Sequence, residues 1–574
     1  MVRDIQMTTT ESFPDVNNEV IALNRHGSEI KPDEYELNTV PAPQAEPKKT
    51  RSNFRLVAIM IALMLSLFIA ALDQTIIATA IPTISAEFHS ASGYVWVGGA
   101  YLLANAAALP IWAKLSDIWG RKPILMTAVS LFFSASIVCA TAVDMKMLII
   151  GRAFQGTAAG GLIQLVNITI SDLFSMRSRS LYLGLVEFVW AVAGGGGPVV
   201  GGAFTELVSW RWNFWINLPI CGTTFLLLLI FLDVHNPRTG AIEGLKAIDW
   251  FGILCVLSFV LMLLLGLNFG GAIFPWNSPT VICLIVFGCF MSVLFIFSEK
   301  KLARYPLMPL ALFRERSNVG SLVVAFCQGM VFIGGEYYLP LFFQSVRQMS
   351  PLHSGLLILP VTITEAVGGM FCGVMIHRTG RYLELIWAGL TLMLIGNGMY
   401  IHLNASSSLA EIIAFELVAG AGAGLLFEPP LIALQAFVAQ DDTATATATF
   451  GFIRNLATSF SIVIGGVLFS GGMQLREPVL RGADVPANVI EELTGGDAAA
   501  NVHVVQTIAD SAQQLAVKQA FAWSLRNLWI FYTCVSAVGL IASLFIKRRV
   551  LSKEHTETKT GLKKVEVVTT DIRG

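Results

Sequence analysis

Long apolar runs recur along most of the chain, and short polar breaks separate them. A helix of about 20 apolar residues crosses a hydrocarbon core of roughly 30 Å, so these runs are long enough to span a membrane. Turn-forming residues mark several breaks, as at Pro82, Pro237 and Pro275. The pattern predicts fourteen spanning helices, at 56–80, 95–113, 123–143, 147–170, 181–204, 213–232, 249–269, 280–298, 319–343, 353–376, 384–403, 409–435, 448–470 and 523–546.

Lys and Arg are unevenly distributed between alternate breaks. If the N-terminus lies in the cytoplasm, the short breaks on the other side keep only Lys146, Arg211 and Arg347. This bias is what the positive-inside rule requires of a correct topology. We therefore expect both ends of the chain in the cytoplasm. Asn404 begins a glycosylation sequon in a break that this topology places outside.

Composition fits a polytopic membrane protein. Hydrophobic residues make up 55% of the chain and charged residues 13%, with a mean hydropathy of +0.67; soluble domains carry about 25% charged residues. The eight cysteines lie in apolar runs without CxxC or Cys/His spacing, so we expect no disulfide framework and no metal site. The sequence has neither a Walker A motif nor a nucleophile elbow, which argues against ATP-driven transport and against an enzyme.

Charged residues inside the predicted spans are functional candidates, because a charge at the centre of a bilayer costs about 3 kcal/mol on insertion scales. Asp73 lies in the outer third of the first span, and Arg152 lies near the outer end of the fourth, which runs the opposite way. Their shared depth predicts a direct or water-bridged ion pair. Two interpretations are open: the pair couples transport to protons, or it is a static buried salt bridge.

Other carboxylates lie deeper in the spans, and no histidine lies in the middle of one. A proton carrier in the core must therefore be a carboxylate. Glu187 and Glu365 are candidates for proton coupling, with contact to a cationic substrate as their alternative role. Glu428 and Arg454 lie at similar depth, which predicts a possible second ion pair near the inner face. The deeper carboxylates are Glu187, Glu336, Glu365, Glu416 and Glu428.

Four segments carry motif-like sequence. The glycines around Pro198 allow a helix to pack closely and bend, and Asp117 and Arg121 put opposite charges into one tight turn. The segments are LDQTIIATAIP (72–82), AKLSDIWGRK (113–122), GRAFQGTAAG (151–160) and GGGGPVVGG (194–202), the last followed by WRWNFWINLP (210–219). Their order and spacing over residues 55–546 resemble the fourteen-helix drug:proton antiporter family of the major facilitator superfamily. More narrowly, they are similar to its fungal toxin and multidrug efflux pumps.

The resemblance implies a role for each motif. Asp117, Gly120, Arg121 and Lys122 would form a cytoplasmic gate that latches the two halves. Asp73 and Arg152 match the family's proton-linked pair. The antiporter hinge would comprise Gly197, Pro198, Gly201 and Gly202. Two positions depart from the family's usual glycines, Ala113 and Ala193.

The resemblance also implies an all-α major facilitator fold, with two six-helix bundles and two inserted helices. We expect a disordered cytoplasmic tail at 1–54, the first bundle at 55–235, the linker helices at 236–318, the second bundle at 319–546 with an outside loop at 471–522, and a cytoplasmic tail at 547–574.

The expected function is proton-coupled export of hydrophobic or amphipathic small molecules, such as a toxin, a secondary metabolite or a drug. We expect a monomer in the plasma membrane that binds protons and substrate, without cofactor or nucleic acid. The alternatives are a vacuolar basic amino-acid transporter, a siderophore–proton carrier and a non-transporting receptor or scaffold built on the same fold. The sequence does not identify the substrate.

Overall fold

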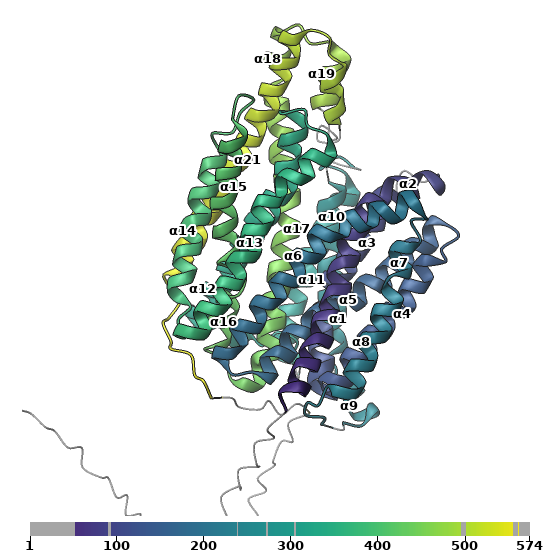
Figure 1. Ribbon diagram of the computed structural model, residues 1–574, viewed down its shortest axis with the longest axis vertical. Helices are drawn as coiled ribbons and strands as arrows, with labels where there is room; N and C mark the ends of the chain where they lie inside the picture. Colours follow the sequence, from purple (N-terminus) through teal and green to yellow (C-terminus); the bar gives the residue numbers. More distant parts are fainter. Residues whose placement is uncertain are drawn as a thin grey trace, which may run out of the picture. The chain divides into compact units, whose positions relative to one another are not determined.

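The computed structural model describes residues 52–89, 93–237, 239–270, 274–303, 306–494 and 501–554, together with Gly561. The predicted tail at 1–54 falls outside the described residues up to residue 51, and the predicted tail at 547–574 is described only to residue 554 and at Gly561. All helices described below belong to the unit Asn53–Gly574 (Figure 1).

The described chain is built from long helices. Thirteen helical segments in it are long and apolar enough to cross a membrane. The N-terminal half contains α1 (Asn53–Ile76), α3 (Gly93–Trp119), α4 (Arg121–Ala140), α5 (Met145–Leu173), α6 (Met176–Leu207) and α8 (Asn217–Phe231); the C-terminal half contains α12 (Arg316–Ser345), α13 (Pro351–Thr379), α14 (Leu383–Tyr400), α15 (Leu409–Gly424), α17 (Thr443–Leu475) and α21 (Ser511–Ser543); α10 (Trp250–Phe269) and α11 (Pro279–Phe297) lie between them in sequence.

The predicted fourth span, α5, is absent from those thirteen, although it is a continuous helix of 29 residues. Arg152, Gln155, Gln164 and several glycines lower its hydropathy. Almost every residue from Gln155 to Leu173 is buried, so its polar side chains face protein rather than lipid. Hydropathy by itself therefore does not identify α5 as a membrane-spanning helix. The thirteen spans together with α5 give the predicted fourteen.

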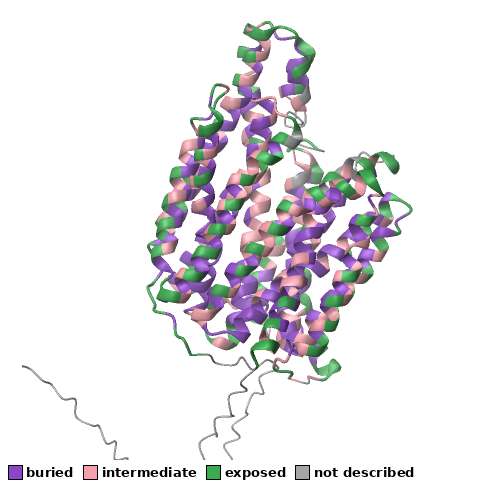
Figure 2. Ribbon diagram, in the orientation of Figure 1, coloured by how far each residue is buried: buried purple, intermediate pink, exposed green. Residues whose placement is uncertain are grey.

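The helices pack as two bundles, which contact each other mainly along two pairs of helices. Within the N-terminal half, α1, α3, α4, α5, α6 and α8 contact one another, and the C-terminal half repeats this with α12, α13, α14, α15, α17 and α21. The halves meet where α6 packs against α13 and where α3 packs against α17, while α10 packs against both α11 and α3. Buried residues concentrate where helices meet (Figure 2).

The two ends of the bundles are distinct. One, here called the turn end, carries the tight turn at Gly120 between α3 and α4. The other, the cap end, carries the short helices α18 (Glu477–Gly482) and α19 (Ala487–Thr494), which follow α17 (Figure 1). Asn404 is exposed between α14 and α15 at the cap end, where its Nδ2 donates to His402 O at 3.1 Å. Its glycosylation stays a prediction.

The last helix is longer than the hydropathy pattern predicts. Its expected start was residue 523, but α21 begins at Ser511, where the Asp510 side chain accepts a hydrogen bond from Ala512 N at 2.8 Å. Phe521 in its first turns packs on Phe469 of α17, with ring centroids 5.7 Å apart. This packing outweighs the polar residues at the start of α21, so the predicted loop at 471–522 is largely helical among its described residues.

Candidate functional site

Asp73 and Arg152 form a buried ion pair inside the N-terminal bundle. Asp73 comes from α1 and is fully buried, and Arg152 comes from α5 and is 1% exposed. The guanidinium also donates through Nε to Val97 O at 3.0 Å, and it lies over the Tyr101 ring with its Cζ 4.3 Å from the centroid. The structure thus brings together the two charges that share a depth in the sequence.

Two amides complete the hydrogen bonding of this pair. Gln155 and Asn217 each donate from an amide nitrogen to Asp73 Oδ1 at 2.8 Å. Gln155 Oε1 accepts from Arg152 NH1 at 2.9 Å, and its Nε2 donates to Ser136 Oγ at 2.9 Å. The Asp73 cluster, defined as Asp73, Ser136, Arg152, Gln155 and Asn217, therefore joins α1, α4, α5 and α8. A buried carboxylate without such donors would be strongly unfavourable.

Sequence reasoning missed Gln155 and Asn217. Both lie within quoted motifs, Gln155 three residues after Arg152 and Asn217 in WRWNFWINLP. Neutral amides carry no charge that would single them out in the sequence. For Gln155, however, the position one helical turn from Arg152 was an available signal.

At the turn end, Arg121 binds two carboxylates. Its NH1 contacts Asp117 Oδ1 at 2.5 Å, and its Nε contacts Asp172 Oδ2 of α5 at 2.7 Å, with the side chain 1% exposed. Gly120 has a φ of +92°, and a Cβ there would lie 3.0 Å from Pro237 Cδ. Lys122 Nζ donates to Leu229 O at 2.7 Å. The turn is thus fixed by buried charges and by a backbone conformation that favours glycine.

Hydrogen bonds connect the two halves at this same end. Thr445 Oγ1 of α17 donates to Asp117 Oδ2 at 3.4 Å. Arg179 NH1 of α6 donates to Gln435 Oε1 at 2.6 Å, where Gln435 ends the short helix α16 (Pro429–Gln435). Gln435 Nε2 in turn donates to Thr447 Oγ1 at 2.8 Å and to Ser171 Oγ of α5 at 3.1 Å. These buried contacts hold the ends of the two bundles together.

Backbone contacts reinforce that closure along α6 and α13. Arg177 donates through Nε to His377 O at 2.6 Å, and Ser180 Oγ donates to Gly373 O at 3.1 Å. A Cβ at Gly373 would lie 2.6 Å from Ser180 O. Neither Arg179 nor Gln435 stood out in the sequence, because they are 256 residues apart and only the fold brings them together.

The glycines of the predicted hinge differ in their surroundings. A Cβ at Gly197 would lie 2.1 Å from Thr75 Oγ1, and one at Gly201 would lie 2.1 Å from Ile76 O. Gly202 has open space around it, and Pro198 is half-buried within α6. Thr75 Oγ1 also donates to Ala193 O at 2.9 Å. Gly197 and Gly201 therefore form a close contact between α1 and α6, whereas hinge bending stays a prediction.

We expect Gly201→Ala to destabilise the protein and Gly202→Ala to leave it nearly unchanged. The added methyl group at Gly201 would overlap the Ile76 carbonyl and force α1 and α6 apart, at a cost of about 1–3 kcal/mol. At Gly202 the change should stay within about 0.5 kcal/mol. Thermal unfolding of the two purified variants measures the difference, and equal melting temperatures would contradict the contact.

The deeper charged residues gather at the interface between the halves. Glu187 (α6), Glu365 (α13) and Glu428, which precedes α16, all lie within electrostatic range of Arg454 of α17. A Cβ added at Gly369 of α13 would lie 3.1 Å from Glu187 Cβ, so α6 and α13 approach closely at this point. Glu365 and Glu428 are 6% and 3% exposed, while Glu187 and Arg454 are half-buried.

The predicted Glu428–Arg454 ion pair is not formed among the described residues. Phe427, the neighbour of Glu428, instead covers the guanidinium, whose Cζ lies 4.4 Å from the ring centroid. Both carboxyl oxygens of Glu428 are buried without a hydrogen-bond partner. Equal depth along two helices was the basis of the prediction, but it does not fix which way a side chain points at the break between α15 and α16.

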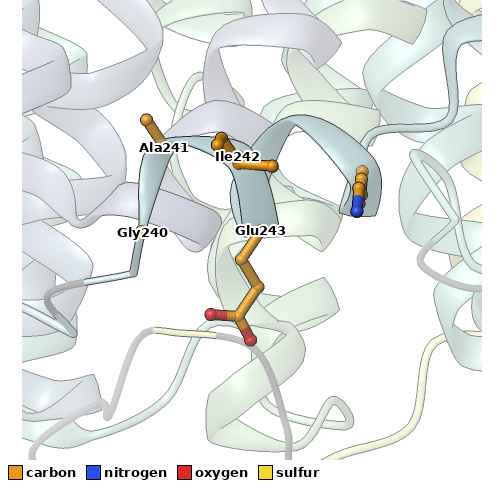
Figure 3. Close-up of a pocket in the computed structure, with 5 residues that line it drawn as sticks. Gly240, Ala241, Ile242 and Glu243 are labelled. Atoms are coloured by element: carbon orange, nitrogen blue, oxygen red, sulfur yellow. The ribbon is translucent and has the colours of Figure 1, made fainter.

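A surface pocket lies away from all these residues. It is lined by Gly240, Ala241, Ile242, Glu243 and Lys246 around the short helix α9 (Ala241–Ala247), between α8 and α10 (Figure 3). It contains none of the candidate site residues, and we assign it no role.

Two membrane-spanning bundles with buried charges inside them and at their interface are the architecture of a membrane transport protein. The Major Facilitator Superfamily model matches residues 63–462. The chain belongs to the major facilitator superfamily, and it is a secondary transporter rather than an enzyme.

Relatives cover most of its length. The chain is 46% identical over 504 residues to the efflux pump dotC of Dothistroma septosporum, covering 88% of this chain and 86% of that protein. It is 40% identical over 531 residues to the MFS-type transporter ppz2 of Metarhizium majus, covering 92% and 91%. The human organic anion transporter MFSD10 matches with a TM-score of 0.55 at 15% identity, covering 86% of this chain and 99% of that one, which shows the fold alone.

Proposed function

We propose that this transporter exports hydrophobic or amphipathic small molecules in exchange for protons. Extensive similarity to proteins named as efflux pumps supports export, including the 46% identity over 504 residues with dotC. The substrate would be a toxin, a secondary metabolite or a drug, bound between the bundles and released by alternating access.

The observation that carries proton coupling is the Asp73 cluster. Asp73 is a fully buried carboxylate held by Arg152, Gln155 and Asn217. In a low-dielectric interior the attraction of the two charges is strong, and a proton on Asp73 would remove it. Asp73 and Thr75 lie on one helix, and Thr75 contacts α6 at Gly197. A weaker Asp73–Arg152 pair would therefore allow α1 to move, and α1 would transmit that movement to α6 at the bundle interface.

Glu187 and Glu365 would form a second stage of proton coupling. They lie on α6 and α13, the helices along which the halves meet, and both act electrostatically on Arg454. Motion of one bundle against the other would change their distance to that arginine and hence their proton occupancy.

We further propose that the turn end faces the cytoplasm, as the distribution of basic residues predicts. The contacts of Arg179, Gln435, Asp117 and Thr445 then close the pathway on the cytoplasmic side. The described conformation is outward-facing in this scheme, and the gate residues Asp117, Gly120, Arg121 and Lys122 stabilise it.

The proposal is tested in proteoliposomes that contain the purified full chain and carry an imposed pH gradient. The neutral probe 9-anthracenemethanol should move against the direction of proton flow, and a protonophore should abolish this flux to the level of protein-free liposomes. Flux that ignores the gradient would rule out proton antiport.

Cellular location separates the remaining alternatives. A fluorescent fusion in the plasma membrane supports export from the cell, as proposed here. A vacuolar location, with gradient-driven uptake of lysine or arginine, would favour the basic amino-acid transporter, and gradient-driven flux of a ferric siderophore would favour the siderophore carrier.

A further inference from the structure

Arg454 is a charged side chain at the bundle interface whose donors are unused. Its guanidinium offers five N–H groups, yet none of them forms a hydrogen bond or an ion pair within the described part of the chain. The guanidinium instead lies over the face of Phe427, with its Cζ 4.4 Å from the ring centroid. The side chain is half-buried, so its donors stay accessible.

Carboxylates surround Arg454 without contacting it. Glu187 from α6, Glu365 from α13 and Glu428 from the break before α16 lie within electrostatic range of it, and Glu336 of α12 lies within that range of Glu365. Glu428 is the most informative, because it is 97% buried (3% exposed) and both its oxygens lack a partner. An ionised carboxylate in that setting would be strongly unfavourable, which favours the protonated form of Glu428.

The N-terminal half contributes a second unsatisfied group. Gln164 of α5 is 2% exposed, and its Nε2 has no hydrogen-bond partner. It lies beside Gly451, where a Cβ would come within 2.8 Å of Gln164 Oε1, and Gly451 precedes Arg454 on α17 by about one turn. Unused donors from both bundles therefore lie in the same region.

Aromatic side chains provide the apolar part of this region. The Phe427 ring packs edge-on against Phe332 of α12, with centroids 5.2 Å apart. A planar guanidinium beside an aromatic face suits a planar acidic group attached to a ring, because guanidinium binds carboxylate in a fixed two-bond geometry.

We propose that Arg454 binds the acidic group of an aromatic substrate, a carboxylate or a phenolate, while Phe427 packs against its ring. This inference rests on the proposed export function and adds a substrate class to it.

Three probes that share one ring system test the charge preference. They are 9-anthracenecarboxylate, 9-anthracenemethanol and 9-(aminomethyl)anthracene, which are anionic, neutral and cationic at pH 7. Fluorescence titration of the full chain in nanodiscs should show the carboxylate binding at least about tenfold more tightly than the other two. Equal affinities, or tightest binding of the amine, would overturn the proposal.

Arg454→Gln should remove this preference, because glutamine keeps the length of the side chain but not the charge or the fork. The matched control is Arg476→Gln. Arg476 also lies on an aromatic ring, with its Cζ 4.3 Å from the Trp523 centroid, but it ends α17 at the cap end. The control should keep the preference, and a preference that survives in Arg454→Gln contradicts the assignment.

Glu428→Gln gives an independent result should Arg454→Gln not fold. Glutamine is neutral like a protonated glutamate, so the preference for anthracenecarboxylate should persist in this variant. Loss of the preference would contradict a neutral Glu428 beside Arg454.

Gradient-driven flux of 9-anthracenemethanol separates this inference from the proposed function. Gradient-driven flux without any preference for the carboxylate leaves proton antiport standing and removes the substrate assignment. A preference for the carboxylate combined with flux that ignores the gradient would rule out proton antiport and leave the substrate assignment standing.

Discussion

Asp73→Asn is expected to abolish gradient-driven flux and to destabilise the protein by about 3–5 kcal/mol. The substitution leaves Arg152 buried with no counter-charge, which is the costly way to break a buried pair. Thermal unfolding measures the stability, and flux of 9-anthracenemethanol in proteoliposomes measures the coupling. The stability loss by itself would not distinguish a proton-coupling pair from a static one.

The double variant Asp73→Asn/Arg152→Gln makes that distinction. Both charges are removed together, so much of the lost stability should return, because no unpaired charge stays in the bundle. Coupling should not return, because no titratable group is left in the Asp73 cluster. A folded double variant with normal gradient-driven flux would show that the pair only holds the fold.

Glu87→Gln is the matched control for both variants. Glu87 pairs with Arg211 in the same half at 2.9 Å, but its side chain is 43% exposed. The Trp210 indole N–H donates to Glu87 at 2.6 Å and, with Arg211, lowers the pKa of that carboxyl. An exposed pair contributes no more than about 1 kcal/mol, so flux and stability should change little.

Gln435→Leu is expected to shift the transporter toward the state in which the bundles part at the turn end. Arg179, 1% exposed, would lose the oxygen acceptor of its NH1 group and keep there the weak acceptor Met176 Sδ at 3.1 Å. An unsatisfied buried donor costs about 1–3 kcal/mol, which corresponds to a shift of about 5- to 150-fold in the equilibrium between the two states.

Cysteine labelling at position 445 measures that shift. Thr445 is 7% exposed and contacts Asp117 across the interface. Thr445→Cys in a cysteine-free background should react faster when Gln435 is leucine. Gln474→Leu is the control, because Gln474 is exposed and its side chain donates to Thr494 O at 3.3 Å near the cap end, far from the bundle contacts at the turn end. Equal labelling rates would exclude a latch at Gln435.

Much of the fold could be predicted from the sequence because hydropathy is a local property. A run of apolar residues must be a membrane-spanning helix wherever it packs, since the backbone has no other way to satisfy its hydrogen bonds in lipid. The last spanning helix was predicted to start at residue 523, because polar residues in its first turns lower the hydropathy there; α21 begins at Ser511 and packs on α17.

Pairing of side chains was less predictable. Depth along a helix follows from counting residues, and this brought Asp73 and Arg152 together correctly. The same count failed for Glu428 and Arg454, because contact also depends on how each helix is rotated about its axis. Phe427 occupies the position that the prediction gave to Glu428.

The sequence by itself determined which residues cross the membrane, which charges they carry and the family resemblance, because these are written in local composition and motif order. The tertiary structure decided which polar groups share a site: Gln155 and Asn217 around Asp73, and Gln435 against Arg179. Neutral amides become recognition groups only when packing removes water and sets them beside a charge. The same packing leaves Arg454 without a hydrogen-bonded partner among the described residues, at the interface where a substrate would bind.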